Sequence, residues 1–198
     1  MRILSLSTAM FGFTEVALRN HTRYAAKHNH SYDFHLGSLD PSRPPAWSKL
    51  LHIERNLKEM EIGEWLLWID ADAFFINQEP KLESLIIPDK DMVLCVDAQN
   101  NENTGVWFWR KCKWSMDYLR ELWNQERFIH HQWWENMAFM QTWKPHANHI
   151  GWQPFKSLNV YPDDYQAGDF VLHVAGGNKI NRLQMAAQQH PEVRDALV

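Results

Sequence analysis

The sequence predicts an α/β domain built on a parallel sheet, and three features support this prediction. Residues 3–7 and 31–36 are typical of short strands, and residues 14–27 between them have the apolar spacing of a helix. Residues 65–69 form a continuous apolar run, which is typical of a strand buried on both faces. A length of 198 residues with 45% hydrophobic content suits one globular domain, so we expect residues 1–198 to be a single domain.

Composition excludes several classes of protein. A net charge of -4 gives no electrostatic reason to expect binding to nucleic acid or to an anionic membrane. Cys95 and Cys112 lack the spacing of a zinc site, and two cysteines do not suggest a disulfide scaffold. The first eight residues are too few and too polar for a signal peptide or membrane anchor. We therefore expect the chain as given to be soluble and cytoplasmic; its oligomeric state is not predicted.

The N-terminal half places two candidate site residues beside its first two helices. Residues 7–12 form a loop after the first strand, where Thr8 either contacts a base or ribose or caps a turn. After a polar, proline-containing loop at residues 37–45, residues 47–60 have the apolar stripe of a helix. Lys49 lies in its first turn, which is mildly unfavourable for a cation. It is therefore either a contact for an anionic partner or a solvated lysine.

Two acids end the central apolar run. If the backbone stays extended, Asp70 and Asp72 point to the same side, just past the carboxyl end of the strand, where open α/β sheets bind ligands. Carboxylates about 4 Å apart repel by roughly 4 kcal/mol at an effective dielectric near 20, which favours a cation between them. Hard divalent ions such as Mg²⁺ or Mn²⁺ prefer such oxygen ligands. The alternative is that one Asp caps the next turn and the other is solvated.

The C-terminal half contributes further polar residues near element ends. A strand at 92–96 ends at Asp97. Asn103 precedes a strand at 104–109, which has Gly105 at its start. Asn103 either orients a sugar hydroxyl or caps its loop. A helix at 112–123 and another at 132–143 follow. Glu135 and Asn136 lie in the first turn of the latter, away from an apolar stripe that we expect to comprise Trp133, Met137 and Met140. Glu135 there could simply favour the helix dipole.

A histidine interrupts the last apolar strand, at residues 170–174. His173 is either a satisfied core residue or a ligand, and Gly176, Gly177 and Lys179 follow, whose backbone N–H groups and ammonium could face phosphate oxygens. Residues 181–198 are a helix or a mobile tail. Most of the 11 tryptophans should serve packing, although some, with Trp107, Trp109 and Trp152 as candidates, could stack on sugars.

In this order, several motifs together resemble the galactosyl-/xylosyl-/mannosyl-transferase family of yeast and plants. They cover nearly the whole chain and are more specific together than singly. The matching segments are Trp47-Ser48-Lys49, Trp65 to Ala73 with the Asp-x-Asp motif, Asn103-Thr104-Gly105-Val106, Arg110 to Ser115, and Gly168 to Gly176. The resemblance implies the single-domain GT-A fold, a Rossmann-like, mixed and mostly parallel sheet flanked by helices.

The resemblance also implies a retaining glycosyltransferase that uses Mn²⁺ (or Mg²⁺) and a nucleoside-diphosphate sugar, with UDP favoured over GDP, and a glycan or glycoprotein acceptor. Asp70, Asp72 and His173 would hold the metal. Glu135 and Asn136, the latter where relatives often have glutamine, would lie beside the anomeric carbon. The implied donor-binding residues are Thr8, Lys49, Asp70, Ala71, Asp97, Asn103, Gly176, Gly177 and Lys179.

Two other functions remain open from the residues alone. A nucleotidyltransferase or phosphohydrolase could use the same acidic metal site, although an aspartyl phosphatase usually has its Asp-x-Asp motif after the first strand. A non-catalytic carbohydrate-binding module would explain the tryptophans. For the transferase, the leaving phosphate could accept the acceptor's proton, or Glu135 could act as a covalent nucleophile.

Overall fold

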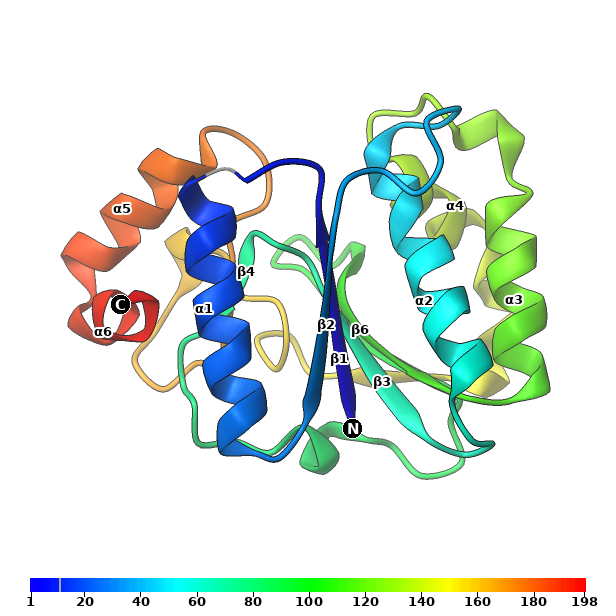
Figure 1. The fold of residues 1–198 in the computed structure, drawn as a ribbon, viewed down its shortest axis with the longest axis horizontal. Helices are drawn as coiled ribbons and strands as arrows, with labels where there is room; N and C mark the ends of the chain where they lie inside the picture. The colour runs from blue at the N-terminus through cyan, green and yellow to red at the C-terminus, as the bar shows by residue number, and fades with distance from the viewer. Residues whose placement is uncertain (11) are drawn as a thin grey trace.

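A central six-stranded sheet with the order β2-β1-β3-β6-β5-β7 organises the computed structural model, which describes residues 1–10 and 12–198 (Figure 1). The β1–β2, β1–β3 and β5–β7 pairs are parallel, and β3–β6 and β5–β6 are antiparallel. The expected mixed, mostly parallel sheet is thus confirmed. Its strands are β1 (Arg2–Ser7), β2 (Ser31–Leu36), β3 (Trp65–Ile69), β5 (Met92–Val96), β6 (Glu102–Arg110) and β7 (Ile150–Gln153).

Six α-helices surround the sheet within the described residues. In Figure 1, α1, α5 and α6 lie on one side, and α2, α3 and α4 lie on the other. The helices are α1 (Gly12–Lys27), α2 (Ser48–Glu59), α3 (Lys113–Trp123), α4 (Trp134–Thr142), α5 (Lys179–Gln189) and α6 (Pro191–Leu197), with short 3-10 turns at Pro45–Trp47, Leu82–Leu85, Glu126–Phe128, Lys144–His149 and Pro162–Asp164. The C-terminal segment is therefore helical. No helix among the described residues has the length and apolar character needed to cross a bilayer.

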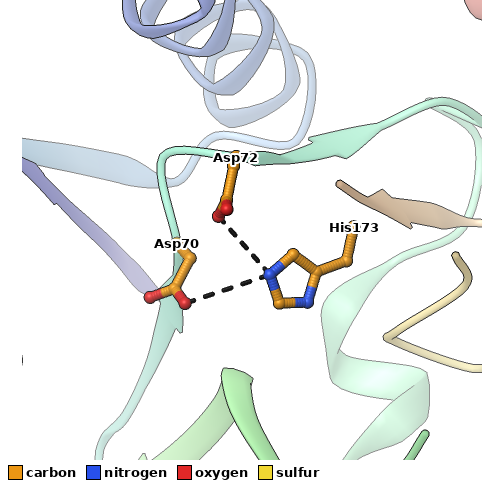
Figure 2. A group of neighbouring side chains, drawn as sticks. All are labelled: Asp70, Asp72 and His173. Carbon is orange, nitrogen blue, oxygen red and sulfur yellow. Dashed lines mark ion pairs between the residues drawn. The ribbon is translucent and has the colours of Figure 1, made fainter. Parts of the chain in front are cut away.

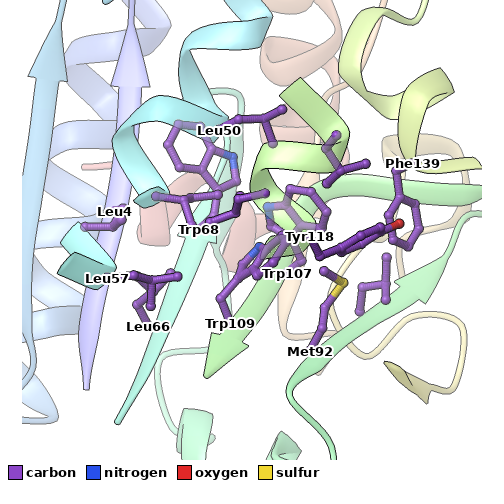
Figure 3. Packing of buried hydrophobic residues seen from close by; sticks show 14 of the residues in the cluster. Leu4, Leu50, Leu57, Leu66, Trp68, Met92, Trp107, Trp109, Tyr118 and Phe139 are labelled. Carbon is purple, nitrogen blue, oxygen red and sulfur yellow. The ribbon is translucent and has the colours of Figure 1, made fainter. Parts of the chain in front are cut away.

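Side chains that alternate along the strands build a core on each face of the sheet. Leu66 and Trp68 of β3 join one core cluster, under α2, α3 and α4, whereas Leu67 and Ile69 join the other (Figure 3). Trp107 and Trp109 are fully buried in the first cluster, and Trp152 packs against it. These three tryptophans therefore serve packing.

A separate two-stranded sheet follows the central strand. The run at residues 65–77 does not continue as one strand: it turns at residues 70–72 and resumes as β4 (Ala73–Phe75), which pairs antiparallel with β8 (Val171–His173). A third core cluster lies between this pair and α1, α5 and α6. The turn therefore separates two packed regions of the molecule. Phe11, in the expected loop at 7–12, lies outside the described residues.

Two further expectations differ from the structure. Strand β7 was not predicted, because Ile-Gly-Trp-Gln is too short to show a period of two. In α4 the buried residues are Glu135, Ala138, Phe139 and Thr142, so the predicted inward stripe of Trp133, Met137 and Met140 is wrong. Trp133 lies before the helix and is exposed. Glu135 is buried instead, because the buried ammonium of Lys49 pairs with its carboxylate.

Candidate functional site

A cleft of about 960 Å³ lies where β1 and β3 end, between the two groups of helices. All the site residues predicted from the sequence line it: Thr8, Lys49, Asp70, Ala71, Asp72, Asp97, Asn103, Glu135, Asn136, His173, Gly176, Gly177 and Lys179. The structure thus brings together residues that are up to 171 positions apart, from Thr8 to Lys179. Their individual roles remain predictions.

One side of the cleft, which we call the metal wall, consists of Asp72, His173 and Lys179, with Asp70 at its inner end. A turn, rather than an extended backbone, makes the two aspartates converge: the N–H of Ala73 donates to the carbonyl of Asp70 at 2.9 Å. The N–H of Val174 donates to the carbonyl of Asp72 at 2.8 Å, which fixes the turn against the segment after β8. The predicted convergence is correct, and the extended geometry assumed for it is wrong.

The imidazole of His173 faces both carboxylates (Figure 2). Its Nε2 lies 3.4 Å from Oδ1 of Asp72 and 4.0 Å from Oδ2 of Asp70. Its Nδ1 lies 2.5 Å from Oδ1 of Asn159 and donates to it, which leaves Nε2 directed at the acids. Gly105 makes room for the ring, because a β-carbon there would lie 2.3 Å from Cε1 of His173.

This donor set fits a divalent cation. Asp70, Asp72 and His173 each offer one ligand atom, and these atoms lie within 4.8 Å of one another. Two carboxylate oxygens and an imidazole nitrogen suit Mn²⁺ or Mg²⁺. Lys179 Nζ lies 2.5 Å from Oδ2 of Asp72. Burial alone would raise the pKa of Asp72, but His173 and Lys179 hold it well below its usual range, so the carboxylate is ionised and able to bind a cation.

The opposite side, which we call the lysine wall, consists of Lys49, Thr104, Glu135 and Asn136. Lys49 is buried, and its ammonium lies 3.0 Å from Oδ1 of Asp70 and 2.9 Å from Oε1 of Glu135. It also donates to the carbonyl of Thr104 at 3.2 Å. Burial alone would lower the pKa of Lys49, but the two carboxylates raise it above its usual value. Lys49 is thus not the solvated residue considered above; its anionic partners include two acids of this chain.

Glu135 and Asn136 differ in how much of their bonding capacity is free. Asn136 Oδ1 accepts from N and Oγ1 of Thr104, and its Nδ2 donates to the carbonyl of Glu102. Glu135 Oε1 contacts Lys49 and Thr104, whereas Glu135 Oε2 is buried without a hydrogen-bond partner. Burial raises the pKa of Glu135, against the opposing charge of Lys49. Glu135 Oε2 therefore keeps bonding capacity that the described residues leave unused.

The remaining predicted residues also line the cleft. Asp97 Oδ1 accepts from the backbone N–H groups of Gln99 and Asn101, and Asn103 Oδ1 accepts from that of Gly105, so both residues cap their loop. Thr8 is exposed. The two glycines before α5, Gly176 and Gly177, have φ values of 72° and 56°, which favour glycine.

Sequence reasoning missed four residues of this site. Trp68 donates from Nε1 to Oδ1 of Asp70 at 2.7 Å, and it could have been found from its place two residues before that acid. Asn159 orients His173 from 14 residues away, for which the sequence gives no signal. Trp133 and Trp134 line the cleft and are 45% and 42% exposed. Trp133 was missed because it was expected in the apolar stripe that faces the core.

The sequence is similar to known glycosyltransferases. Residues 7–98 match the galactosyl transferase GMA12/MNN10 family. An α-1,2-galactosyltransferase of Schizosaccharomyces pombe is 23% identical over 216 residues, which cover 84% of this chain and 56% of the relative. The chain therefore spans little more than half of that relative's length. The resemblance stated from the sequence is confirmed.

Solved structures share the fold. A glycosyltransferase involved in glycosylation of the major capsid of PBCV-1 superposes with a TM-score of 0.78 and 16% identity, covering 94% of this chain and 98% of that chain. A mutant Drosophila β-1,4-galactosyltransferase 7, in a complex with manganese, UDP-Gal and xylobiose, superposes with a TM-score of 0.51 and 13% identity, covering 91% and 73%. The likeness shows that the chain has the GT-A glycosyltransferase fold.

Proposed function

Because the chain has the GT-A fold and resembles the GMA12/MNN10 family, we propose that residues 1–198 act as one metal-dependent glycosyltransferase domain. It moves a sugar from a nucleoside-diphosphate donor, UDP favoured over GDP, to a hydroxyl of a glycan or glycoprotein acceptor, with retention of configuration. The observation that carries this proposal is the convergence of Asp70, Asp72 and His173 at the cleft. The galactosyltransferase that shares the fold was solved with manganese and UDP-Gal, which supports Mn²⁺ as the ion.

The metal wall would hold the diphosphate. Asp70, Asp72 and His173 would bind the cation, which when present supplies Lewis-acid stabilisation of the charge that develops on the leaving diphosphate. Lys179 would turn from Asp72 toward a phosphate oxygen, since its side chain is 38% exposed and free to move. The N–H groups around Gly176 and Gly177, just before α5, would add hydrogen bonds to the same anion.

The lysine wall would hold the transferred sugar. Lys49 keeps Glu135 and Asp70 in fixed positions, so this wall would present an ordered polar surface to the sugar. Retention follows if the acceptor attacks on the face that the phosphate leaves, with that phosphate accepting the proton. It also follows from two inversions, with Glu135 Oε2 as the nucleophile. The free Oε2 supports a direct role for Glu135, while the engaged amide of Asn136 supports a positioning role.

A melting-temperature screen tests donor and metal together. UDP- and GDP-sugars are added with and without Mn²⁺. Ligand at a hundred times its dissociation constant adds about 2.7 kcal/mol, or roughly 5 to 10 °C for a chain of this size. We expect a shift with UDP-sugars that disappears when a chelator is added. A shift produced by glycans alone, unaffected by a chelator, would instead support the carbohydrate-binding module.

The substitution Asp72→Ala tests the site itself. We expect donor turnover to fall by a factor on the order of a thousand, because several kcal/mol of charge stabilisation is lost. The fold should be little affected, since the partner Lys179 can become solvated. Asp117→Ala, on the exposed part of α3, is the matched control and should retain turnover. Full activity of Asp72→Ala would refute the metal site.

A further inference from the structure

Two adjacent tryptophans stand apart from the other nine. Trp133 and Trp134 are the only tryptophans among the exposed large hydrophobic residues of the described chain, at 45% and 42%. Both line the cleft. The other tryptophans are buried or half-buried, and most pack in the cluster under α2, α3 and α4. Exposed large rings at a ligand cleft are costly to leave in water, which indicates that something covers them.

The backbone of Trp134 is in a conformation that its side chain does not favour. Its φ is 41°, in the left-handed region that bulky residues rarely adopt. The bend that produces it is held by local contacts: the N–H of Trp134 donates to the carbonyl of His131 at 2.9 Å, and that of Trp133 donates to Nδ1 of His131 at 3.1 Å. A glycine would fit the bend better, so packing and backbone geometry do not explain a tryptophan here.

The lysine wall follows this pair directly in the chain. Glu135 directly follows Trp134, and its Oε2 is buried without a hydrogen-bond partner at the same cleft. Contacts lead from there to the metal wall: Glu135 to Lys49 at 2.9 Å, Lys49 to Asp70 at 3.0 Å, and Asp70 to His173 at 4.0 Å. Trp133 and Trp134 therefore belong to the same segment of the chain as the lysine wall, whereas the proposed diphosphate position is at the metal wall.

We propose that Trp133 and Trp134 form the acceptor subsite and select a pyranose ring. The apolar C–H face of the sugar stacks on the indoles. An acceptor of this class is a carbohydrate, rather than a serine or threonine hydroxyl of a protein, because a small aliphatic side chain offers no face for two rings. The inference rests on the proposed function, since it names the acceptor of that transfer.

Fluorine NMR of the full chain labelled with 5-fluorotryptophan tests the subsite. Trp133→Phe and Trp134→Phe assign the two signals. The probes are the methyl α- and β-pyranosides of glucose, galactose, mannose and xylose, added with UDP and Mg²⁺. We expect at least one glycoside to shift both signals, and Trp134→Ala to weaken its binding about tenfold. Trp152→Phe, at a half-buried ring outside the cleft, is the matched control and should bind that glycoside as the unsubstituted chain does.

Three results would overturn the subsite: no glycoside shifts the two signals, glycosides shift only other tryptophans, or UDP alone shifts the pair, which would make it a platform for the base. The melting-temperature response to UDP and Mg²⁺ is measured on the same sample. If that response is present while the glycosides fail, the subsite is wrong and the transferase proposal stands. If UDP gives no response, the proposed donor site is in error, whatever the glycosides do.

Discussion

The two walls of the cleft use the same kinds of residue for opposite purposes. In the lysine wall, the side chain of Lys49 is 6% exposed, and its ammonium has three partners: Asp70, Glu135 and the carbonyl of Thr104. In the metal wall, the side chain of Lys179 is 38% exposed, and its ammonium has one carboxylate partner, Asp72. A lysine in the first wall is part of the protein's own structure, whereas a lysine in the second can exchange its partner for a ligand.

The surrounding elements differ in the same way. The lysine wall rests on the large core cluster under α2, α3 and α4. The metal wall rests on a pair of three-residue strands, β4 and β8, and on the smaller cluster with α1, α5 and α6. The cleft therefore has a strongly supported side and a lightly supported one, and the lightly supported side is where the proposed ion and diphosphate bind.

The matched substitutions Lys49→Met and Lys179→Met test this comparison most severely. Lys49→Met leaves Glu135 and Asp70 without their buried counter-ion, which should cost about 3 to 5 kcal/mol, or roughly 10 °C in melting temperature. Lys179→Met removes a half-exposed ion pair and should cost about 1 kcal/mol or less. Thermal or urea unfolding measures both. Equal losses would show that the walls are not distinct.

Low pH should destabilise the protein through His21, which is hydrogen-bonded to strand β4 beneath the metal wall. This residue is fully buried in α1, where its Nε2 donates to the carbonyl of Ala73 at 2.7 Å, and burial lowers the pKa of His21 to about 4. Because the unfolded chain binds the proton at its usual pKa of 6.5, this contribution is complete above pH 6.5 and is lost as the pH falls from 6.5 toward 4. The total loss is about 3 kcal/mol.

The comparison with His21→Gln isolates that contribution. Unfolding free energies of the two proteins should differ in their slope between pH 6.5 and 4 and run parallel above it. Hydrogen exchange should locate the effect, with amides of β4 and β8 losing protection in acid before those of α4. Parallel curves throughout the range would show that His21 does not support the metal wall as described.

Lys179 should compete with a free cation and assist a diphosphate. Its ammonium lies against Asp72, so we expect Lys179→Ala to bind Mn²⁺ alone about tenfold more tightly, an effect of roughly 1.4 kcal/mol. The same variant should bind UDP with Mn²⁺ more weakly, because a phosphate contact is lost. Calorimetric titration with each ligand measures the two constants. A change in the same direction for both would contradict a lysine that exchanges partners.

The smallest expected effect concerns the strained backbone at the edge of the lysine wall. Trp134→Gly and Trp134→Ala both remove the indole, but alanine keeps a β-carbon at a φ of 41°. We expect the glycine variant to be more stable by about 1 kcal/mol, or 2 to 4 °C. Melting curves of the pair measure this difference. Equal stabilities would show that the bend relaxes when the tryptophan is removed.

Much of the fold could be predicted because apolar residues recur along its helices and strands with a regular spacing. Strand β2 was predicted with its observed bounds, and the apolar run before Asp70 is indeed the central strand. The convergence of the Asp-x-Asp pair with His173 was predicted from the family resemblance and from the rule that ligands bind where strands end. These inferences needed only local pattern and strand order.

The rest depended on contacts that no local pattern shows. The burial of Glu135 depends on Lys49, which lies 86 residues earlier in the chain, so a helix period could not show it. Because the Lys49–Glu135 pair was not predicted, Trp133 rather than Glu135 was expected on the buried face of α4. The orientation of His173 depends on Asn159, and the turn at residues 70–72 depends on the segment after β8.

One dipeptide of strand β6 belongs to both walls. The hydroxyl of Thr104 contacts Glu135 and Asn136, while a β-carbon at Gly105 would meet His173. Both residues lie where the pairing of β6 with β5 is irregular, between the Leu94–Trp107 and Cys95–Asn103 pairs. Insertion or deletion of a single residue here would move the Thr104 hydroxyl away from the acid and would place a residue other than Gly105 against the imidazole. Length changes in this strand should therefore be tolerated far less than substitutions within it.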